Sequence, residues 1–203
     1  FTQLGFNIDK LNLKSLNNVS DCLIQSMDNY NYLLSKEQIL KNKFKNSEIH
    51  IENIALGAKN KKVFFKQFEE SSSSTIKEIN KKSEYYKRKF KLLNFWGNKK
   101  IYQKFRINIK KLSDYIKKKK IKNFDFLKID TEGYEYEILM GLGKKINCVK
   151  ILMFEHHYDN MIKKNYTFSD INSLLVKNNF QLIYKSKMPF RKTFEYIYKK
   201  KER

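Results

Sequence analysis

One segment gives the clearest indication of architecture: Phe126-Leu127-Lys128-Ile129-Asp130-Thr131-Glu132-Gly133-Tyr134-Glu135. It begins as an apolar strand, ends abruptly in carboxylates, and turns at a glycine into a helix that runs past Leu139 to Gly141. α/β enzymes place polar groups in this way, in the crevice outside the carboxyl ends of their strands, where such folds bind ligands. The segment therefore predicts an α/β fold with a ligand site beside Asp130.

The elements around this segment alternate between strand and helix. Strand patterns fall at 1–6, 21–26, 48–56, 62–68, 106–109, 124–129, 149–154, 180–184 and 194–198, the first being the end of a strand. Helical patterns fall at 30–42, 112–119, 135–146 and 167–178. Such alternation implies right-handed crossovers and a mostly parallel sheet, and the terminal hairpin adds an antiparallel last strand. We predict a Rossmann-like methyltransferase fold with a seven-stranded, mostly parallel sheet and helices on both faces.

Length and composition fit one domain over residues 1–203. With 41% hydrophobic residues, the chain can bury a sizeable core. No apolar run approaches the length of a membrane span, and no leader with a cleavage site is evident, so a cytoplasmic location is expected. The chain starts at Phe1, and its first strand is predicted to be truncated there. Residues 76–104, rich in Lys and aromatics, are predicted to be an insertion or a lid over the site.

The formal net charge of +22 suggests attraction to anionic partners. Almost all of the positive charge is Lys, however, and only four residues are Arg, the side chain that forks onto phosphate. A specific nucleic-acid site is therefore not expected, and a basic nucleic-acid-binding protein is only the third hypothesis for function. Weak association with anionic surfaces is retained as an expectation, and the oligomeric state is not indicated.

The segment from Leu127 to Gly141 resembles the signature of the FkbM family of S-adenosylmethionine-dependent methyltransferases. That signature is a lysine-isoleucine-aspartate-x-glutamate-glycine-x-glutamate run followed by leucine-x-glycine. Further matches lie at Asn53 to Leu56, at Leu112 to Tyr115 and at Phe154-Glu155, so the resemblance spans about residues 50–200. It implies S-adenosylmethionine as the cofactor and O-methylation of a small-molecule or glycan acceptor, such as a secondary metabolite.

The resemblance also implies where the cofactor binds. Gly5 and Asn7 match the family's glycine-rich turn, whereas Gln3 and Asp9 replace an acidic residue and a glycine of that turn. The implied cofactor-binding residues are Gly5, Phe6, Asn7, Gln25, Ser26, Ile54, Ala55 and Asp130.

The family's glutamate for the ribose hydroxyls is replaced here by the corner Gln25–Ser26. A carboxylate offers a ribose diol two charge-assisted acceptors, whereas Gln reproduces only one. This departure motivates an alternative hypothesis of a different class, a degenerate family member that keeps the fold as a binding or scaffold module without catalysis.

A hydroxyl nucleophile needs help in losing its proton, so carboxylates and histidines near Asp130 are the candidate catalytic groups. Asp130 and Glu132 follow the strand directly, and the alternative role for both is to cap the helix and offset its dipole. His156, at the end of the next strand, has the pKa range of a base, as does His157, and the alternative for both is a structural loop histidine. The predicted catalytic residues are Asp130, Glu132 and His156.

Other polar residues of this region are expected to be structural. Glu135 and Glu137, further along the helix, are predicted to be solvated or ion-paired. No required metal is predicted, because Glu155 and its neighbours lack a complementary cluster of ligands. Cys22 and Cys148 lack the spacing of a metal site or a disulfide framework and are predicted to be buried free thiols.

Overall fold

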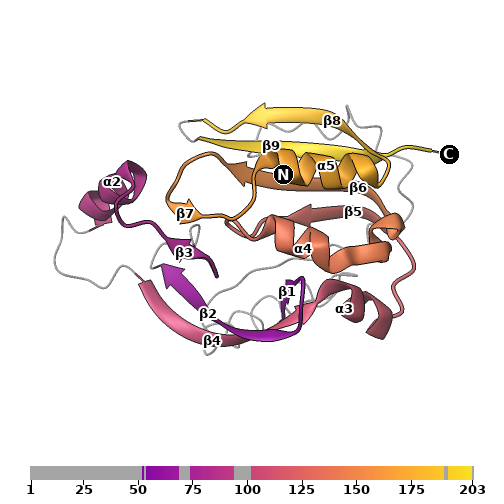
Figure 1. Cartoon of the computed structure of the whole chain (residues 1–203), viewed down its shortest axis with the longest axis horizontal. Helices are drawn as coiled ribbons and strands as arrows, with labels where there is room; N and C mark the ends of the chain where they lie inside the picture. The colour runs from indigo at the N-terminus through magenta and orange to yellow at the C-terminus, as the bar shows by residue number, and fades with distance from the viewer. Residues whose placement is uncertain (1–51, 53, 69–73, 94–101, 190–191, 203) are drawn as a thin grey trace, which may run out of the picture.

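A computed structural model describes residues 52, 54–68, 74–93, 102–189 and 192–202 of the chain. The strands of these residues form three separate sheets of four, three and two strands. Figure 1 shows the four-stranded sheet above the three-stranded sheet, with the short two-stranded sheet to one side. No helix within the described ranges is long and apolar enough to cross a membrane.

The four-stranded sheet has the order β5-β6-β9-β8. Its strands are β5 (Phe124–Ile129), β6 (Val149–His157), β9 (Thr193–Lys200) and β8 (Phe180–Lys187). β5 and β6 are parallel, whereas β9 runs antiparallel to both β6 and β8. Helices α4 (Glu135–Leu142) and α5 (Phe168–Lys177) lie on the same face of this sheet (Figure 1). A capping box between Thr167 and Asp170 begins α5.

The three-stranded sheet has the order β1-β4-β2, with β1 (Ala55–Gly57), β4 (Tyr102–Lys111) and β2 (Lys61–Phe68). β1 is parallel to β4, and β2 is antiparallel to it. Helix α3 (Leu112–Lys118) follows β4 without a break.

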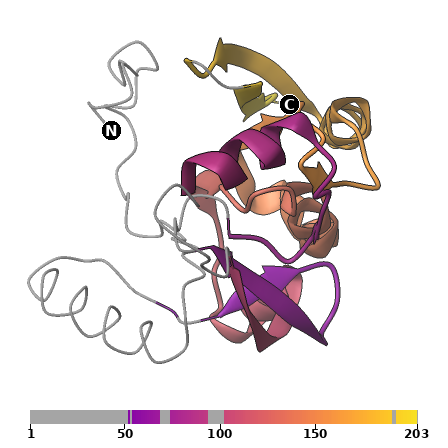
Figure 2. The same cartoon turned by 90° about the vertical axis from the view of Figure 1, so that its left-hand side faces the viewer.

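The two-stranded sheet joins β3 (Glu78–Ile79) to β7 (Ile162–Lys163), and α2 (Glu84–Leu93) lies at the same end of the molecule, nearest the viewer in Figure 2.

The predicted seven-stranded, mostly parallel sheet is wrong. Only two of the strand pairs in the described residues, β1–β4 and β5–β6, are parallel. Strands β2 and β4 are exposed or half-buried over most of their length, and antiparallel strands tolerate water on one face in a way that parallel strands do not. In the part of the chain that the structure describes, α4 and α5 both lie on one face of the four-stranded sheet, not on opposite faces. The predicted first strand lies outside the described residues.

Individual elements follow the predictions more closely. The strand predicted at 124–129 is β5, and the helix predicted at 112–119 is α3. The helix predicted at 135–146 ends at Leu142, because Gly143 has a φ of +50° and the chain continues as a 3-10 helix, Gly143–Cys148. β6 extends three residues beyond the predicted 149–154, so that Glu155 and both histidines after it are strand residues.

The main core lies between the two larger sheets and the helices. Phe154, which is fully buried, stacks on Tyr196 and Tyr198 of the neighbouring strand, with ring centroids 5.5 and 5.9 Å apart. Helix α4 packs on β1 so closely that a Cβ atom at Gly141 would lie 2.1 Å from the carbonyl oxygen of Gly57. This close approach brings α4, which covers the four-stranded sheet, directly against the three-stranded sheet.

We expect Gly141→Ala to destabilise the protein by about 1–3 kcal/mol, because the added methyl group would force α4 away from β1. Met140→Ala is the matched control, since Met140 is the adjacent helix residue and its side chain is exposed. Urea denaturation of both variants measures the difference. Equal stabilities for the two variants would contradict the close packing of α4 on Gly57.

Candidate active site

The Glu135 carboxylate fixes the loop that follows β5. Its Oε1 atom accepts hydrogen bonds from the Gly133 amide (2.9 Å), the Thr131 hydroxyl (3.2 Å) and the Thr131 amide (3.3 Å). Its Oε2 atom accepts a hydrogen bond from the Tyr166 hydroxyl (2.6 Å), and Glu135 is only 1% exposed. Burial and the nearby Glu135 carboxylate raise the pKa of Tyr166. The prediction that Glu135 is solvated or ion-paired is therefore wrong, because a buried network of donors surrounds it.

Glu137, one residue beyond Tyr136 on α4, does form an ion pair as predicted, with Lys77. The Lys77 ammonium also donates to the Asn165 side chain and lies 5.4 Å from the ring centres of Tyr134 and Tyr166. The segment around β3 is thereby tied to the start of α4.

Glu132 is held in an unusual backbone conformation inside this loop. Its φ of +48° is left-handed, and Gly133 follows with a φ of +90°. For a residue with a side chain, this conformation costs about 1–2 kcal/mol. The Thr75 hydroxyl donates to the carbonyl oxygen of Glu132 (2.7 Å), and Thr75 is fully buried. These contacts direct the Glu132 side chain toward the end of β6.

Glu132 meets His157 there. The Glu132 Oε2 and His157 Nε2 atoms are 3.3 Å apart, and both side chains are largely buried. Burial raises the pKa of Glu132 to about 7, although His157 acts in the opposite direction. A carboxyl group with this pKa exchanges a proton readily at neutral pH, as a general base must.

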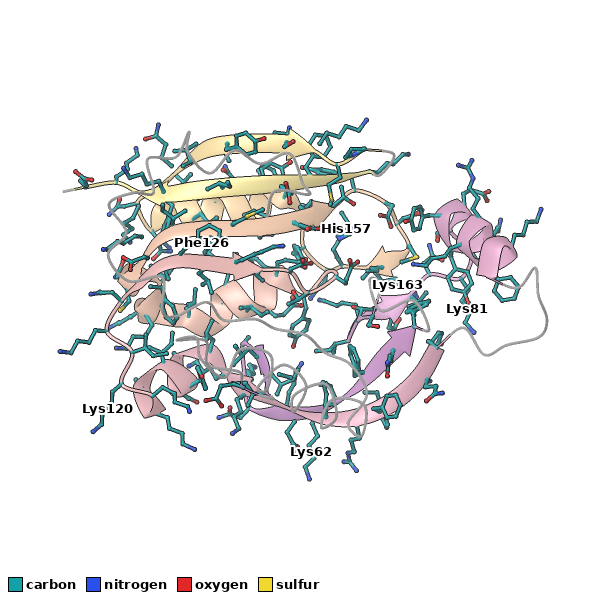
Figure 3. All side chains as sticks on the ribbon, turned by 180° about the vertical axis from the view of Figure 1, so that it is seen from behind. Lys62, Lys81, Lys120, Phe126, His157 and Lys163 are labelled. Carbon is teal, nitrogen blue, oxygen red and sulfur yellow. The ribbon has the colours of Figure 1, made fainter. Side chains whose placement is uncertain are left out.

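His157 is oriented by groups on its other side. Its Nδ1 atom lies 3.0 Å from the Thr193 hydroxyl and 3.8 Å from Asp159 Oδ2. Burial by itself lowers the pKa of His157, but the carboxylates of Asp159 and Glu132 outweigh burial and raise the pKa above its ordinary value. Figure 3 shows His157 at the end of β6, near β7. The imidazole therefore lies between Glu132 on one side and Thr193 and Asp159 on the other.

His156 occupies the opposite face of the sheet. It is 3% exposed, and its ring packs against Tyr158 and Phe168, with centroids 4.8 and 6.0 Å away. Burial lowers the pKa of His156 to about 3, and its Nδ1 atom has no hydrogen-bond partner in the described residues. The structure thus brings His157, and not His156, to Glu132. The catalytic role of His156 stays a prediction without a contact to support it.

Three carboxylates lie in a row across the sheet beside this pair. Glu155 and Glu195 are direct cross-strand partners on β6 and β9, and both are more than nine-tenths buried. Asp130 follows Ile129, the partner of Phe154, so it lies next to Glu155 and 3.2 Å from Lys128 Nζ. Burial, and then the Asp130 carboxylate, raise the pKa of Glu155 well above its ordinary range. This end of the sheet is therefore lined by three carboxyl groups, with Lys128 beside them.

The predicted cofactor residues are only partly covered by the structure. Ala55 is buried in the main core, and Ile54 packs beside it, so both lie on the three-stranded sheet. Asp130 lies at the acidic edge of the other sheet. The other predicted cofactor-binding residues, Gly5, Phe6, Asn7, Gln25 and Ser26, lie outside the described residues. Cys22, predicted to be a buried thiol, lies outside them as well. Within the described ranges, no three metal-ligating side chains come together, and Cys148 is a free thiol.

Comparison with known families decides the classification. The profile named Methyltransferase FkbM domain matches residues 23–182. The chain belongs to the FkbM methyltransferase family. No curated protein and no solved structure matches it significantly. In this FkbM family member, the matched range includes Glu132, Glu135 and His157 but ends within β8, so Thr193 and Glu195 come from beyond it.

We expect Tyr166→Phe to lower the free energy of unfolding by about 1–3 kcal/mol, because it removes a hydrogen-bond donor from a buried carboxylate. Tyr136→Phe is the matched control, since Tyr136 stacks on Tyr166 and its hydroxyl has no hydrogen bond with any described residue. Urea denaturation measures both variants. The role given to Glu135 would be untenable if the two variants lost the same stability.

Proposed function

We propose that this FkbM family member is a cytoplasmic, S-adenosylmethionine-dependent O-methyltransferase that acts on a hydroxyl of a glycan or secondary metabolite. The observation that supports this proposal is the buried Glu132–His157 pair at the carboxyl end of β5, in a chain of a methyltransferase family. Residues 1–203 would form one domain, with residues 76–104 as an insertion or lid.

Glu132 would act as the general base. It would take the proton from the acceptor hydroxyl as the oxygen attacks the methyl group, and its pKa of about 7 suits this transfer at neutral pH. His157 would hold the Glu132 carboxylate in place and stabilise its ionised form through their 3.3 Å contact. Thr193 and Asp159 fix the imidazole from the opposite side. This arrangement supports a hydroxyl, rather than a group that is already deprotonated, as the nucleophile.

The acidic edge fits the charge of the proposed donor. S-adenosylmethionine supplies an electrophilic methyl group on a positively charged sulfonium. Asp130, Glu155 and Glu195 place three carboxyl groups on one face of the sheet, with Lys128 as the cation that the structure shows beside them. Opposite charge within a few ångströms favours binding of a cation, and it does so more strongly in a partly buried site. Asp130, the most exposed of the three, is the residue best placed to meet a ligand.

Methyl transfer should become faster as the pH rises through about 7, because Glu132 accepts a proton only after it has lost its own. Glu132→Gln should lower the rate by about 10²–10⁴-fold and remove this pH dependence. Rates are measured with radiolabelled donor and an acceptor found by screening hydroxyl-bearing glycans and metabolites. Glu78→Gln, an exposed acid on nearby β3, is the control that should keep the parent profile. A parent rate that does not vary with pH would contradict the base assigned here.

The donor itself is tested by calorimetry on the full-length chain. We expect both S-adenosylmethionine and S-adenosylhomocysteine to bind, and Asp130→Asn to weaken the first more than the second, because only the first carries the sulfonium charge. Asp125→Asn, at the opposite end of β5 and paired with Lys150, should change neither affinity. If neither ligand gives a measurable heat of binding at high protein concentration, the proposed activity is contradicted. That result would favour the degenerate, non-catalytic alternative.

A further inference from the structure

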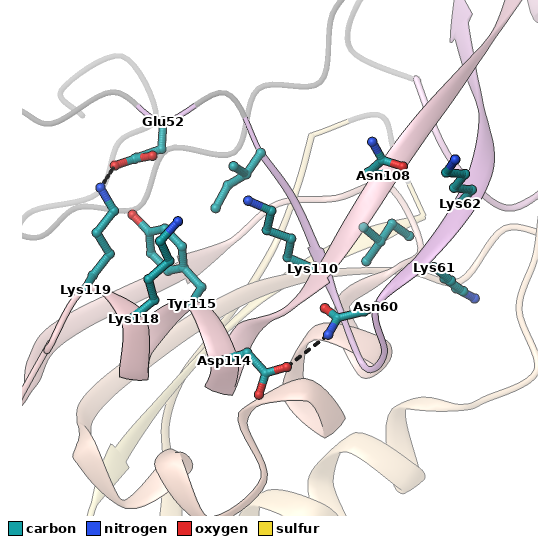
Figure 4. Close-up of a pocket in the computed structure, with 12 residues that line it drawn as sticks. Glu52, Asn60, Lys61, Lys62, Asn108, Lys110, Asp114, Tyr115, Lys118 and Lys119 are labelled. Atoms are coloured by element: carbon teal, nitrogen blue, oxygen red, sulfur yellow. Dashed lines mark hydrogen bonds and ion pairs between the residues drawn. The ribbon is translucent and has the colours of Figure 1, made fainter.

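A hollow of about 610 Å³ opens on the three-stranded sheet, apart from the carboxylates described above. It lies between β4, the β1–β2 turn and helix α3 (Figure 4). Ile54, Ile109 and Tyr115 are its apolar members, and Ile109 and Tyr115 are buried beneath it. Its volume lies within the range of small-molecule sites, about 300–1,000 Å³. The hollow is therefore large enough for a ligand with a ring.

The charges around the hollow are strongly unbalanced. Five lysines line it against two carboxylates, which leaves three positive charges in excess. Both carboxylates are already engaged, Glu52 by Lys119 and Asp114 by the Asn60 amide at 3.1 Å. The other lining lysines are Lys61, Lys62, Lys110 and Lys118, and their ammonium groups form no ion pair or hydrogen bond with any described residue.

Three of these lysines, Lys62, Lys110 and Lys118, line the hollow from different elements. Lys62 pairs with Asn108 across β2 and β4, so both side chains lie on one face of the sheet, and Lys110 lies on that face two residues further along. Lys118 comes from α3 on the other side of the hollow (Figure 4). The Asn108 amide lies among them and can donate hydrogen bonds. Cations from three elements, β2, β4 and α3, thus line one hollow, which differs from a run of lysines along an exposed helix.

The frame of the hollow is fixed before any ligand arrives. The Asn60 side chain accepts a hydrogen bond from the Lys111 amide (2.7 Å) and donates one to Asp114 Oδ2 (3.1 Å). Asn60 thereby joins the β1–β2 turn to the junction of β4 and α3. A site that is already ordered loses less entropy on binding.

We propose that this hollow on the three-stranded sheet, apart from the Glu132–His157 pair, is a binding site for an organic phosphate. A phosphate monoester carries nearly two negative charges and three acceptor oxygens, and the excess positive charge of the hollow, together with the Asn108 amide, would attract it. Ile54 and Tyr115 would contact the organic part of the ligand, whereas Ile109 points from the other face of β4 into the main core. A monocarboxylate has one charge and satisfies fewer of these donors.

The test uses the full-length chain and phenyl phosphate as the probe, with benzoate as the matched monoanion. We expect calorimetry to show phenyl phosphate binding more tightly than benzoate. The triple variant Lys62→Gln, Lys110→Gln, Lys118→Gln should weaken phenyl phosphate by about tenfold or more, equal to about 1.4 kcal/mol. The control Lys144→Gln, Lys177→Gln, Lys187→Gln removes the same charge from exposed positions elsewhere and should leave the affinity unchanged. Thermal melting confirms that both variants are folded.

Vesicles of phosphatidylcholine with or without phosphatidic acid identify the source of the phosphate. Binding of free phenyl phosphate supports a soluble ligand, and binding only to phosphatidic acid vesicles, lost in the first triple variant, supports a lipid headgroup. Equal losses in the two triple variants would show general charge attraction and overturn the proposal. The absence of binding to both phenyl phosphate and phosphatidic acid vesicles would also overturn it. Binding only to an RNA oligonucleotide would overturn it as well. We expect both triple variants to bind S-adenosylhomocysteine as the parent chain does, so failure here is distinguishable from failure of the proposed activity.

Discussion

The buried carboxylate of Glu135 is the interaction on which the candidate site depends. One of its oxygens accepts the donors of Thr131 and Gly133, and the other accepts the Tyr166 hydroxyl. A single side chain therefore joins the end of β5, the first turn of α4 and the segment before α5. An ionised or strongly polar group is stable in such a buried position only when its acceptor sites are filled, as they are here.

The conformation of Glu132 follows from this constraint. Its left-handed backbone is unfavourable by itself, and it persists because neighbouring hydrogen bonds, including the one from Thr75, over-determine the loop. The same loop turns the Glu132 side chain toward His157, into a region where burial raises the pKa of the carboxyl group. Backbone geometry thus sets the electrostatics, because a side chain directed to solvent would keep an ordinary pKa.

Charge is distributed unevenly in this strongly basic chain. The edge of the four-stranded sheet is rich in carboxylates, whereas the hollow on the three-stranded sheet is lined by lysines. These two environments lie on different sheets, and the contact between Gly141 and Gly57 brings α4 directly against the three-stranded sheet. A cationic donor and an anionic ligand would accordingly be attracted to separate parts of the same molecule.

The sequence by itself determined the family, the Asp130–Gly133 loop and most of the elements around it, because these depend on local pattern and on adjacent residues. The nearly continuous apolar run from Val149 to Phe154 predicted a strand, although its end was placed three residues early. That error moved His156 and His157 into a loop, where either could face the site. In a strand they must face opposite sides, and only the tertiary structure decided that His157 is the one beside Glu132. Strand partners and the buried role of Glu135 were likewise beyond the sequence, because pairing and hydrogen bonding join residues far apart in the chain, such as Glu135 and Tyr166 or Glu155 and Glu195.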